Sequence, residues 1–223
     1  MMRSWIVVAV AVVLMHSPAR GQTADASDQS HTQFGQALGV IGAPANAAAP
    51  AYVPMTASER FRHYLRSTYS PGSVVGAAAA AGITQWEDKP KEWKQGAEGY
   101  GDRVGNAYAI HVMRGTIEYG ASALLHEDDR YVRSPDKGFW KRSKHAVGEI
   151  FIARNDAGHE RFAFSRFGGA AGAAFISRIW QPHSTNSAGD GAVVFGINMG
   201  LTAGNNLFHE FWPDIKRHVF KKD

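Results

Sequence analysis

Cysteine is absent from the 223-residue chain. This absence excludes disulfide bonds, thiolate metal ligands and a lipid-modified N-terminal cysteine, so packing alone must hold the fold together. The sequence also lacks Gly-x-Ser-x-Gly, His-Glu-x-x-His and phosphate-binding-loop motifs. Protease, glycosidase and nucleotide-binding functions therefore have no motif to support them.

A strong excess of one charge sign is also missing. The chain has 24 Lys and Arg against 20 Asp and Glu, and Arg3 and Arg20 belong to the N-terminal leader. The rest of the chain is therefore nearly balanced in charge, which does not favour nucleic-acid binding. We expect no nucleic acid among its partners.

The N-terminal leader has the three-part order of a signal peptide. Residues 6–15 are an uninterrupted apolar run after Arg3, too short for the roughly 20 residues that span a bilayer. Small residues, Ala19 and Gly21, precede the expected cleavage point. We therefore predict a cleavable signal peptide over residues 1–21 and export to the periplasm or cell envelope.

Residues 22–56 are rich in Ala, Gln, Ser and Pro and contain few large apolar side chains. Such a segment cannot bury enough surface to offset its ordering entropy, which predicts a disordered leader or linker. The remaining residues, 57–223, are expected to form one helical domain.

The pattern after residue 57 is helical. No segment alternates with period two for long enough to predict a sheet. Ser70-Pro71 is typical of a helix start, and Pro213 kinks or ends the last helix. Helices are predicted near residues 58–65, 71–86, 100–126, 139–153, 164–180 and 188–212. The expected fold is an all-α, compact bundle of five or six helices.

Small residues recur at every fourth position in several of these helices. The rows contain Gly101 and Gly105, then Gly168 and Gly172, and finally Gly196, Gly200 and Gly204. A spacing of four places each row on one helix face. Each helical glycine costs about 1 kcal/mol relative to alanine, and close helix contact would offset that cost. The rows therefore predict helix-packing seams, in a tight soluble bundle or in one that lies wholly or partly in the membrane. We favour a compact domain that leans on a membrane.

The densest polar cluster follows the apolar end of the long helix. Adjacent helical residues point in different directions and no metal-ligand spacing is present, so we expect neither a metal nor another cofactor. We predict instead one internally paired polar network that stabilises the turn. Its members are Arg114, Glu118, His126, Glu127, Asp128 and Arg130.

Two segments carry a resemblance that covers most of the chain after residue 58. They are His126-Glu127-Asp128-Asp129-Arg130-Tyr131 and Phe211-Trp212-Pro213-Asp214. They resemble the His-Glu-Asp-x-Arg-Tyr and Phe-Trp-Pro-Asp segments of an uncharacterised family of exported bacterial helical proteins. The resemblance implies a single domain and brings no activity with it.

A second resemblance covers a shorter stretch. Gly158-His159, Ser177-Arg178 and His183 resemble parts of the motifs of the type 2 phosphatidic acid phosphatase and haloperoxidase family, although Asp156-Ala157 replace its Pro-Ser. That family is helical, and its phosphatases are metal-free. The resemblance implies His159, Arg178 and His183 as catalytic residues that converge on a phosphate.

The sequence thus supports two hypotheses, and whether the chain is an enzyme stays open between them. The first is a non-catalytic cell-envelope protein that packs against the membrane or against helices of another envelope protein. The alternative is a metal-independent phosphohydrolase, or a degenerate relative of one. No small-molecule ligand is predicted.

Overall fold

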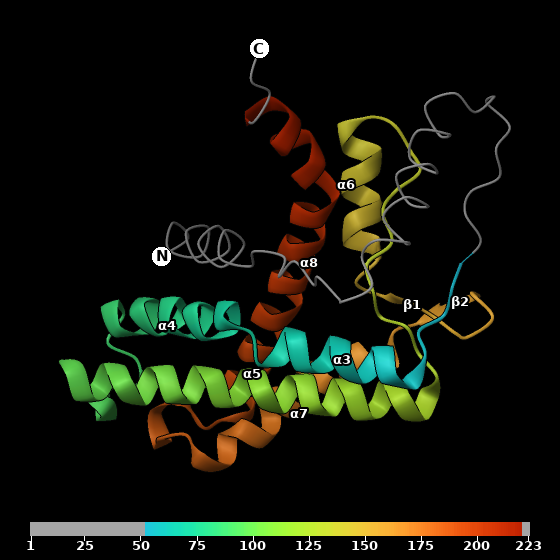
Figure 1. Ribbon diagram of the computed structural model, residues 1–223. Coiled ribbons are helices and arrows are strands. Elements are labelled where there is room, and N and C mark those ends of the chain that lie inside the picture. The colour runs from blue at the N-terminus through green and yellow to red at the C-terminus, as the bar shows by residue number, and fades with distance from the viewer. Residues whose placement is uncertain (1–51, 220–223) are drawn as a thin grey trace, which may run out of the picture. The chain divides into compact units, whose positions relative to one another are not determined.

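The computed structural model describes residues 52–219, so the predicted signal peptide and nearly all of the predicted leader lie outside the described residues. The α-helices are α3 (Ala57–Thr68), α4 (Pro71–Trp86), α5 (Ala97–Leu125), α6 (Phe139–Gly148), α7 (Phe164–Ile176) and α8 (Ala188–Val219). Short 3-10 turns, η1 (Lys91–Trp93), η2 (Ser177–Trp180) and η3 (His183–Thr185), connect some of them. The expected all-α bundle is confirmed (Figure 1).

One small antiparallel hairpin, β1 (Ile152–Arg154) and β2 (Glu160–Phe162), interrupts the helices of the described chain. The prediction of a helix through residue 153 is therefore wrong at its end. Each strand has only three residues, too few for a period-two pattern to be visible in the sequence.

Local side-chain bonds explain where the first helices begin. Thr56 and Glu59 form a capping box at the start of α3, each bonding the backbone N–H of the other. Ser70 accepts a bond from the N–H of Ser73, and Pro71 occupies the first position of α4. The helix start predicted at Ser70-Pro71 is confirmed.

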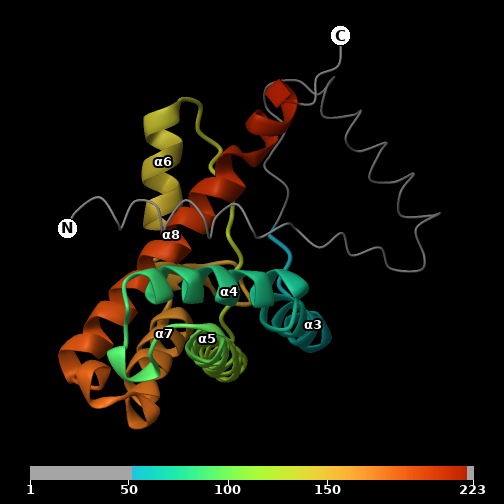
Figure 2. The same ribbon diagram turned by 90° about the vertical axis from the view of Figure 1, so that its left-hand side faces the viewer.

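Helix α5 is central to the packing. Helices α3 and α4 contact it along one side and α7 contacts it along another, while α8 packs on α7 and on α6 (Figures 1 and 2). Both views show α6 beside the C-terminal half of α8, away from α3, α4 and α5. No helix in the described part of the chain is both long and apolar enough to cross a bilayer.

The closest contacts between helices are made at glycines, but only some of these are glycines that the sequence predicted. A Cβ at Gly172 would lie 2.8 Å from Cδ1 of Ile117, so this residue does lie in the α5–α7 seam. Its predicted partner Gly168 is exposed, and the neighbouring Gly169 faces α5 instead. A Cβ at Gly169 would lie 2.8 Å from Cβ of Glu118 and 3.0 Å from the carbonyl oxygen of Arg114.

The other predicted seams are not contacts within the described chain. A Cβ added at Gly101, Gly105, Gly196 or Gly200 would meet no described atom within 4 Å, and all four residues are exposed. Gly204 is half-buried in α8. Spacing places these glycines on common faces, but the faces of Gly101/Gly105 and Gly196/Gly200 point outward because α5 and α8 use other faces for packing.

The buried interior has an unusual composition. The largest fully buried side chains of the described residues are Arg103, Glu127, Glu149, Glu210, Thr68, Ser165 and Ser177. The buried apolar residues are alanines, with Met55 and Ile150. Fully buried charged residues are rare in soluble proteins unless they are paired. Hydrogen bonds to buried charges are therefore a principal element of this fold.

Candidate functional site

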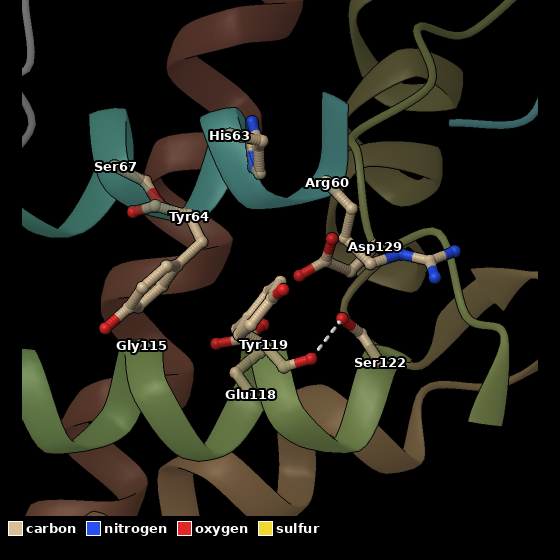
Figure 3. Close-up of a pocket in the computed structure, with 9 residues that line it drawn as sticks. All are labelled: Arg60, His63, Tyr64, Ser67, Gly115, Glu118, Tyr119, Ser122 and Asp129. Carbon is tan, nitrogen blue, oxygen red and sulfur yellow. Dashed lines mark hydrogen bonds between the residues drawn. The ribbon is translucent and has the colours of Figure 1, made fainter. Parts of the chain in front are cut away.

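A pocket of about 160 Å³ lies between α3 and α5. Its wall combines acidic, basic, hydroxyl and aromatic side chains from both helices, and Figure 3 shows Tyr64 of α3 and Tyr119 of α5 extending into the space between the two helices. The lining residues are Arg60, His63, Tyr64 and Ser67 of α3, Gly115, Glu118, Tyr119 and Ser122 of α5, and Asp129 from the segment that follows.

Two acidic groups meet in this pocket. Burial raises the pKa of Glu118 to about 7, Arg114 opposes that rise, and a side-chain hydrogen bond with Asp129 adds to it. The Glu118 side chain is 17% exposed, and its Oε2 lies 3.6 Å from Nε of Arg114. Near neutral pH this arrangement can therefore hold and release one proton.

The two serine hydroxyl groups of the pocket are engaged in their own helices, whereas the Tyr64 hydroxyl lies within hydrogen-bond distance of Thr116 on α5. Ser67 donates to the carbonyl oxygen of Tyr64, and Ser122 donates to that of Tyr119. The two tyrosine rings stack with centroids 4.8 Å apart. A serine nucleophile requires a base within hydrogen-bond reach, and neither serine bonds to one. The pocket thus has the features of a polar packing gap that contains a buried carboxyl group with a raised pKa.

Arg60 is the buried cation beside this pocket. Its side chain is 9% exposed, and within the described chain its Nε has no hydrogen-bond partner. Its Nη2 lies 3.7 Å from Oδ1 of Asp156, which belongs to the hairpin turn. Arg60 therefore connects α3 electrostatically to the hairpin.

The contacts of the described residues do not join the predicted members into a single polar network. The structure divides its six members among separate contacts: Arg114 with Glu118, His126 with Asp156 at 2.9 Å, Glu127 with the start of α7, and Asp128 with Arg130 at 2.6 Å. The cause is local, because His126 ends α5 in the left-handed region with φ 53°. The residues after it leave the helix and point to different neighbours.

Glu127 supplies a cap that α7 lacks locally. Ala163 precedes α7 and has no capping side chain, while Oε2 of the fully buried Glu127 accepts a 2.8 Å bond from the N–H of Ser165. Arg161 Nε lies 3.4 Å from the other carboxylate oxygen. A negative charge at a helix N-terminus is stabilising, so Glu127 joins the end of α5 to the start of α7.

Neighbouring residues link the same segment to the hairpin. The backbone N–H of Asp128 donates to the carbonyl oxygen of Arg154 at 2.7 Å, and the reciprocal bond is 2.9 Å. Arg154 in turn binds both carboxylate oxygens of the buried Glu149 at 2.8 and 3.0 Å. Arg166 donates to the carbonyl oxygen of Asp129 at 2.6 Å. The polar segment is therefore a structural connector.

Glu210 is a buried carboxylate where α8 meets α6. Its carboxylate accepts hydrogen bonds from Tyr131 Oη and Arg142 Nε, both 2.6 Å, and from the N–H of Ser134 at 3.1 Å. Burial alone would raise its pKa, but the bonds from Tyr131 and Arg142 dominate and hold the pKa of Glu210 below its ordinary value.

The three residues of the phosphatase resemblance do not converge. His159 is exposed beside the hairpin turn, before α7, whereas Arg178 and His183 follow the C-terminal end of α7. The thirteen residues of α7 extend about 20 Å between these positions. Arg178 bonds the carbonyl oxygens of Ala174 and Thr185, and it therefore fixes a turn. The sequence suggested a site here because these residues resemble motifs of the phosphatase family.

Residues 52–219 contain no cluster of three or more His, Asp or Glu side chains that could hold a metal ion.

Sequence reasoning missed the apolar exterior. Large apolar side chains are exposed on several elements, including Leu124 at 83%, Ile179 at 84%, Trp86 at 76% and Trp140 at 75%. Hydrophobic periodicity did not predict this exposure, because three of these residues lie in adjacent apolar pairs, Leu124-Leu125, Phe139-Trp140 and Ile179-Trp180, that a buried helix face would also contain. The available signal was the local sequence Lys137-Gly-Phe-Trp-Lys141, in which aromatic residues lie between lysines.

No protein-family model, no curated protein and no solved structure matches this chain.

Proposed function

We propose that this protein is a non-catalytic, exported component of the cell envelope that packs its apolar helix surface against the membrane or partner helices. The observation that carries the proposal is the distribution of side chains between interior and exterior. Charged residues such as Glu127 and Glu210 are fully buried, while tryptophan, phenylalanine and leucine side chains are exposed.

This distribution supports a role in packing. Single exposed apolar residues are normal on soluble proteins, but many large ones together favour a surface that another apolar partner covers. The exposed glycines of α5 and α8 add to the argument, since they permit close backbone approach by a helix from outside the domain.

A catalytic role receives no such support. The serines near the acidic pair bond to their own helices, and His159 lies at the opposite end of α7 from Arg178. No observation favours the phosphohydrolase alternative, and we do not propose it.

Cell fractionation tests the proposal. We expect a tagged full-length chain to be processed before Gln22 and to sediment with the envelope. Detergent, or alkaline carbonate if the packing is peripheral, should release it. Recovery of all the protein as a monomer in the soluble fraction without either treatment would contradict the proposal.

A further inference from the structure

The pair formed by α6 and the C-terminal part of α8 has a defined free end. Phe139 stacks on Phe211 with ring centroids 5.2 Å apart, while Asn206 donates to the carbonyl oxygen of Ala146 at 3.1 Å. The N-terminus of α6 therefore lies beside the C-terminal end of α8, and the two helices run antiparallel. We call residues 137–144 and 211–217 the α6–α8 tip, which both views show away from α5 (Figures 1 and 2).

The α6–α8 tip is built rigidly. Arg142 Nη1 bonds Oδ2 of Asp214 at 2.6 Å, and its guanidinium lies 4.5 Å from the ring centroid of Phe211. Arg142 also bonds the buried carboxylate of Glu210. The exposed residues of the tip are thus carried on two helices that are fixed to each other.

Aromatic side chains project from this tip. Phe139 is 60% exposed and Trp140 is 75% exposed, and their rings meet edge to face at 5.3 Å. Ile215 on α8 is 42% exposed. Trp and Phe on the outside of a rigid element are suited to the boundary between headgroups and acyl chains.

Positive charge surrounds these rings. The basic residues of the tip and of the adjoining segment are Arg133, Lys137, Lys141, Arg142, Lys144, Lys216 and Arg217, and the acidic ones are Asp136, Glu210 and Asp214. Glu210 is buried, and Asp214 bonds both Arg142 and Arg217, so Asp136 is the exposed acid. Trp140 and Lys144 are one helical turn apart and share a face of α6.

This combination distinguishes lipid from protein as the partner. Lysine is depleted in protein–protein interfaces, whereas basic residues around Trp and Phe are typical of helices at membrane surfaces. Anionic lipid headgroups attract each nearby lysine or arginine. We infer that the α6–α8 tip docks on a bilayer surface that contains anionic phospholipid. This inference rests on the proposed function and identifies the membrane as the partner.

The chain offers a matched control. Trp86 at the end of α4 is 76% exposed, nearly the same as Trp140 at 75%. However, Trp86 is followed by the acidic residues Glu87 and Asp88. The inference therefore requires that Trp140 contact lipid and that Trp86 stay in water.

Vesicle flotation tests the inference with the full-length chain purified from the envelope. We expect binding to vesicles of phosphatidylcholine with phosphatidylglycerol, much weaker binding to phosphatidylcholine alone, and release at high salt. K141Q/K144Q should bind about 30-fold more weakly, since each lysine near an anionic surface is worth roughly fivefold. W140A should lose about tenfold or more, and W86A should bind as the unsubstituted chain does.

Tryptophan fluorescence provides an independent readout. Adding anionic vesicles should shift the emission to the blue, and W140F should remove that shift while W86F keeps it. Equal binding to both vesicle types, or equal losses in W140A and W86A with unchanged melting temperatures, would overturn the inference. If either result is obtained while the protein still sediments with the envelope, the proposed function stands, but the partner of the α6–α8 tip is not anionic lipid. A protein that is also soluble on fractionation would contradict both.

Discussion

The hydroxyl of Tyr131 donates a 2.6 Å hydrogen bond to Oε2 of Glu210, which is fully buried. This bond joins the polar segment after α5 to the Glu-Phe-Trp-Pro-Asp segment of α8, the two parts of the chain with the most distinctive sequences. The connection gives the buried carboxylate of Glu210 a hydroxyl donor from a segment 79 residues earlier in the chain.

Glu210→Gln should destabilise the domain strongly. An amide removes the negative charge opposite Arg142, and breaking a buried charge pair costs up to about 3–5 kcal/mol of unfolding free energy, a cost that the remaining bond from Arg142 to Asp214 reduces. Thermal or denaturant unfolding measures the loss, with Asp136→Asn on the exposed surface as the control. Equal stability of the two variants would show that the Glu210 cluster contributes little.

The same carboxylate should make the domain sensitive to acid. The pKa of Glu210 is lowered in the folded protein, mainly because the bonds from Tyr131 and Arg142 outweigh its desolvation. Its stabilising contribution is therefore complete above the ordinary pKa of about 4.5 and disappears as pH falls through the folded value. The melting temperature should drop below pH 4.5, and Glu210→Gln should show a smaller drop.

Glu118 should make the domain less stable as pH rises toward neutrality, the opposite of the effect of Glu210. Burial raises its pKa to about 7, so the folded state holds a proton that the unfolded state releases at about 4.5. Its contribution to stability is full below pH 4.5 and is lost as pH rises through 7. Glu118→Gln should therefore flatten the melting temperature between pH 5 and pH 8. Glu98→Gln, exposed on the same helix, should keep the original slope.

Arg103 should be indispensable for the loop between α4 and α5. Its side chain is 1% exposed, and it donates to the carbonyl oxygens of Lys89, Pro90, Lys94 and Gly99 at 2.8–2.9 Å. Arg103→Ala leaves these acceptors without partners and should cost about 3 kcal/mol or more. Arg66→Ala on the exposed face of α3 should change the unfolding free energy by less than about 0.5 kcal/mol.

Adjacent glycines of α7 should respond in opposite directions. Gly169→Ala places a Cβ 2.8 Å from that of Glu118, and overpacking of this kind costs about 1–3 kcal/mol. Gly168→Ala meets no described atom within 4 Å and should gain up to about 1 kcal/mol from helix propensity. Unfolding of both variants measures the difference, and the same sign for both would show that α7 packs on another face.

These glycines also show how far the sequence could predict the structure. Composition and helix-start signals were sufficient for the all-α fold and for the beginning of α4. The four-residue spacing placed Gly168 and Gly172 on one face, but it could not decide whether Gly168 or Gly169 turns toward α5. That choice depends on the rotation of the whole helix against its neighbour.

The polar contacts were beyond sequence reasoning for a different reason. Glu127 bonds a residue 38 positions away and Tyr131 one 79 positions away, and nothing in the local pattern identifies such partners. Reasoning from proximity along the chain instead grouped Arg114, Glu118 and His126 into one network. The motif resemblance likewise grouped His159, Arg178 and His183, which α7 holds apart.

The long separation of Glu210 from its partners along the chain has a consequence for folding. Arg142 and Tyr131 precede it by 68 and 79 residues, so neither can bond its carboxylate until α8 has been synthesised as far as this residue. Contacts between such distant residues form late in folding. The junction of α6 and α8 can thus close only after the segment between Tyr131 and Glu210 has been made, whereas the packing of α3 and α4 on α5 does not depend on it.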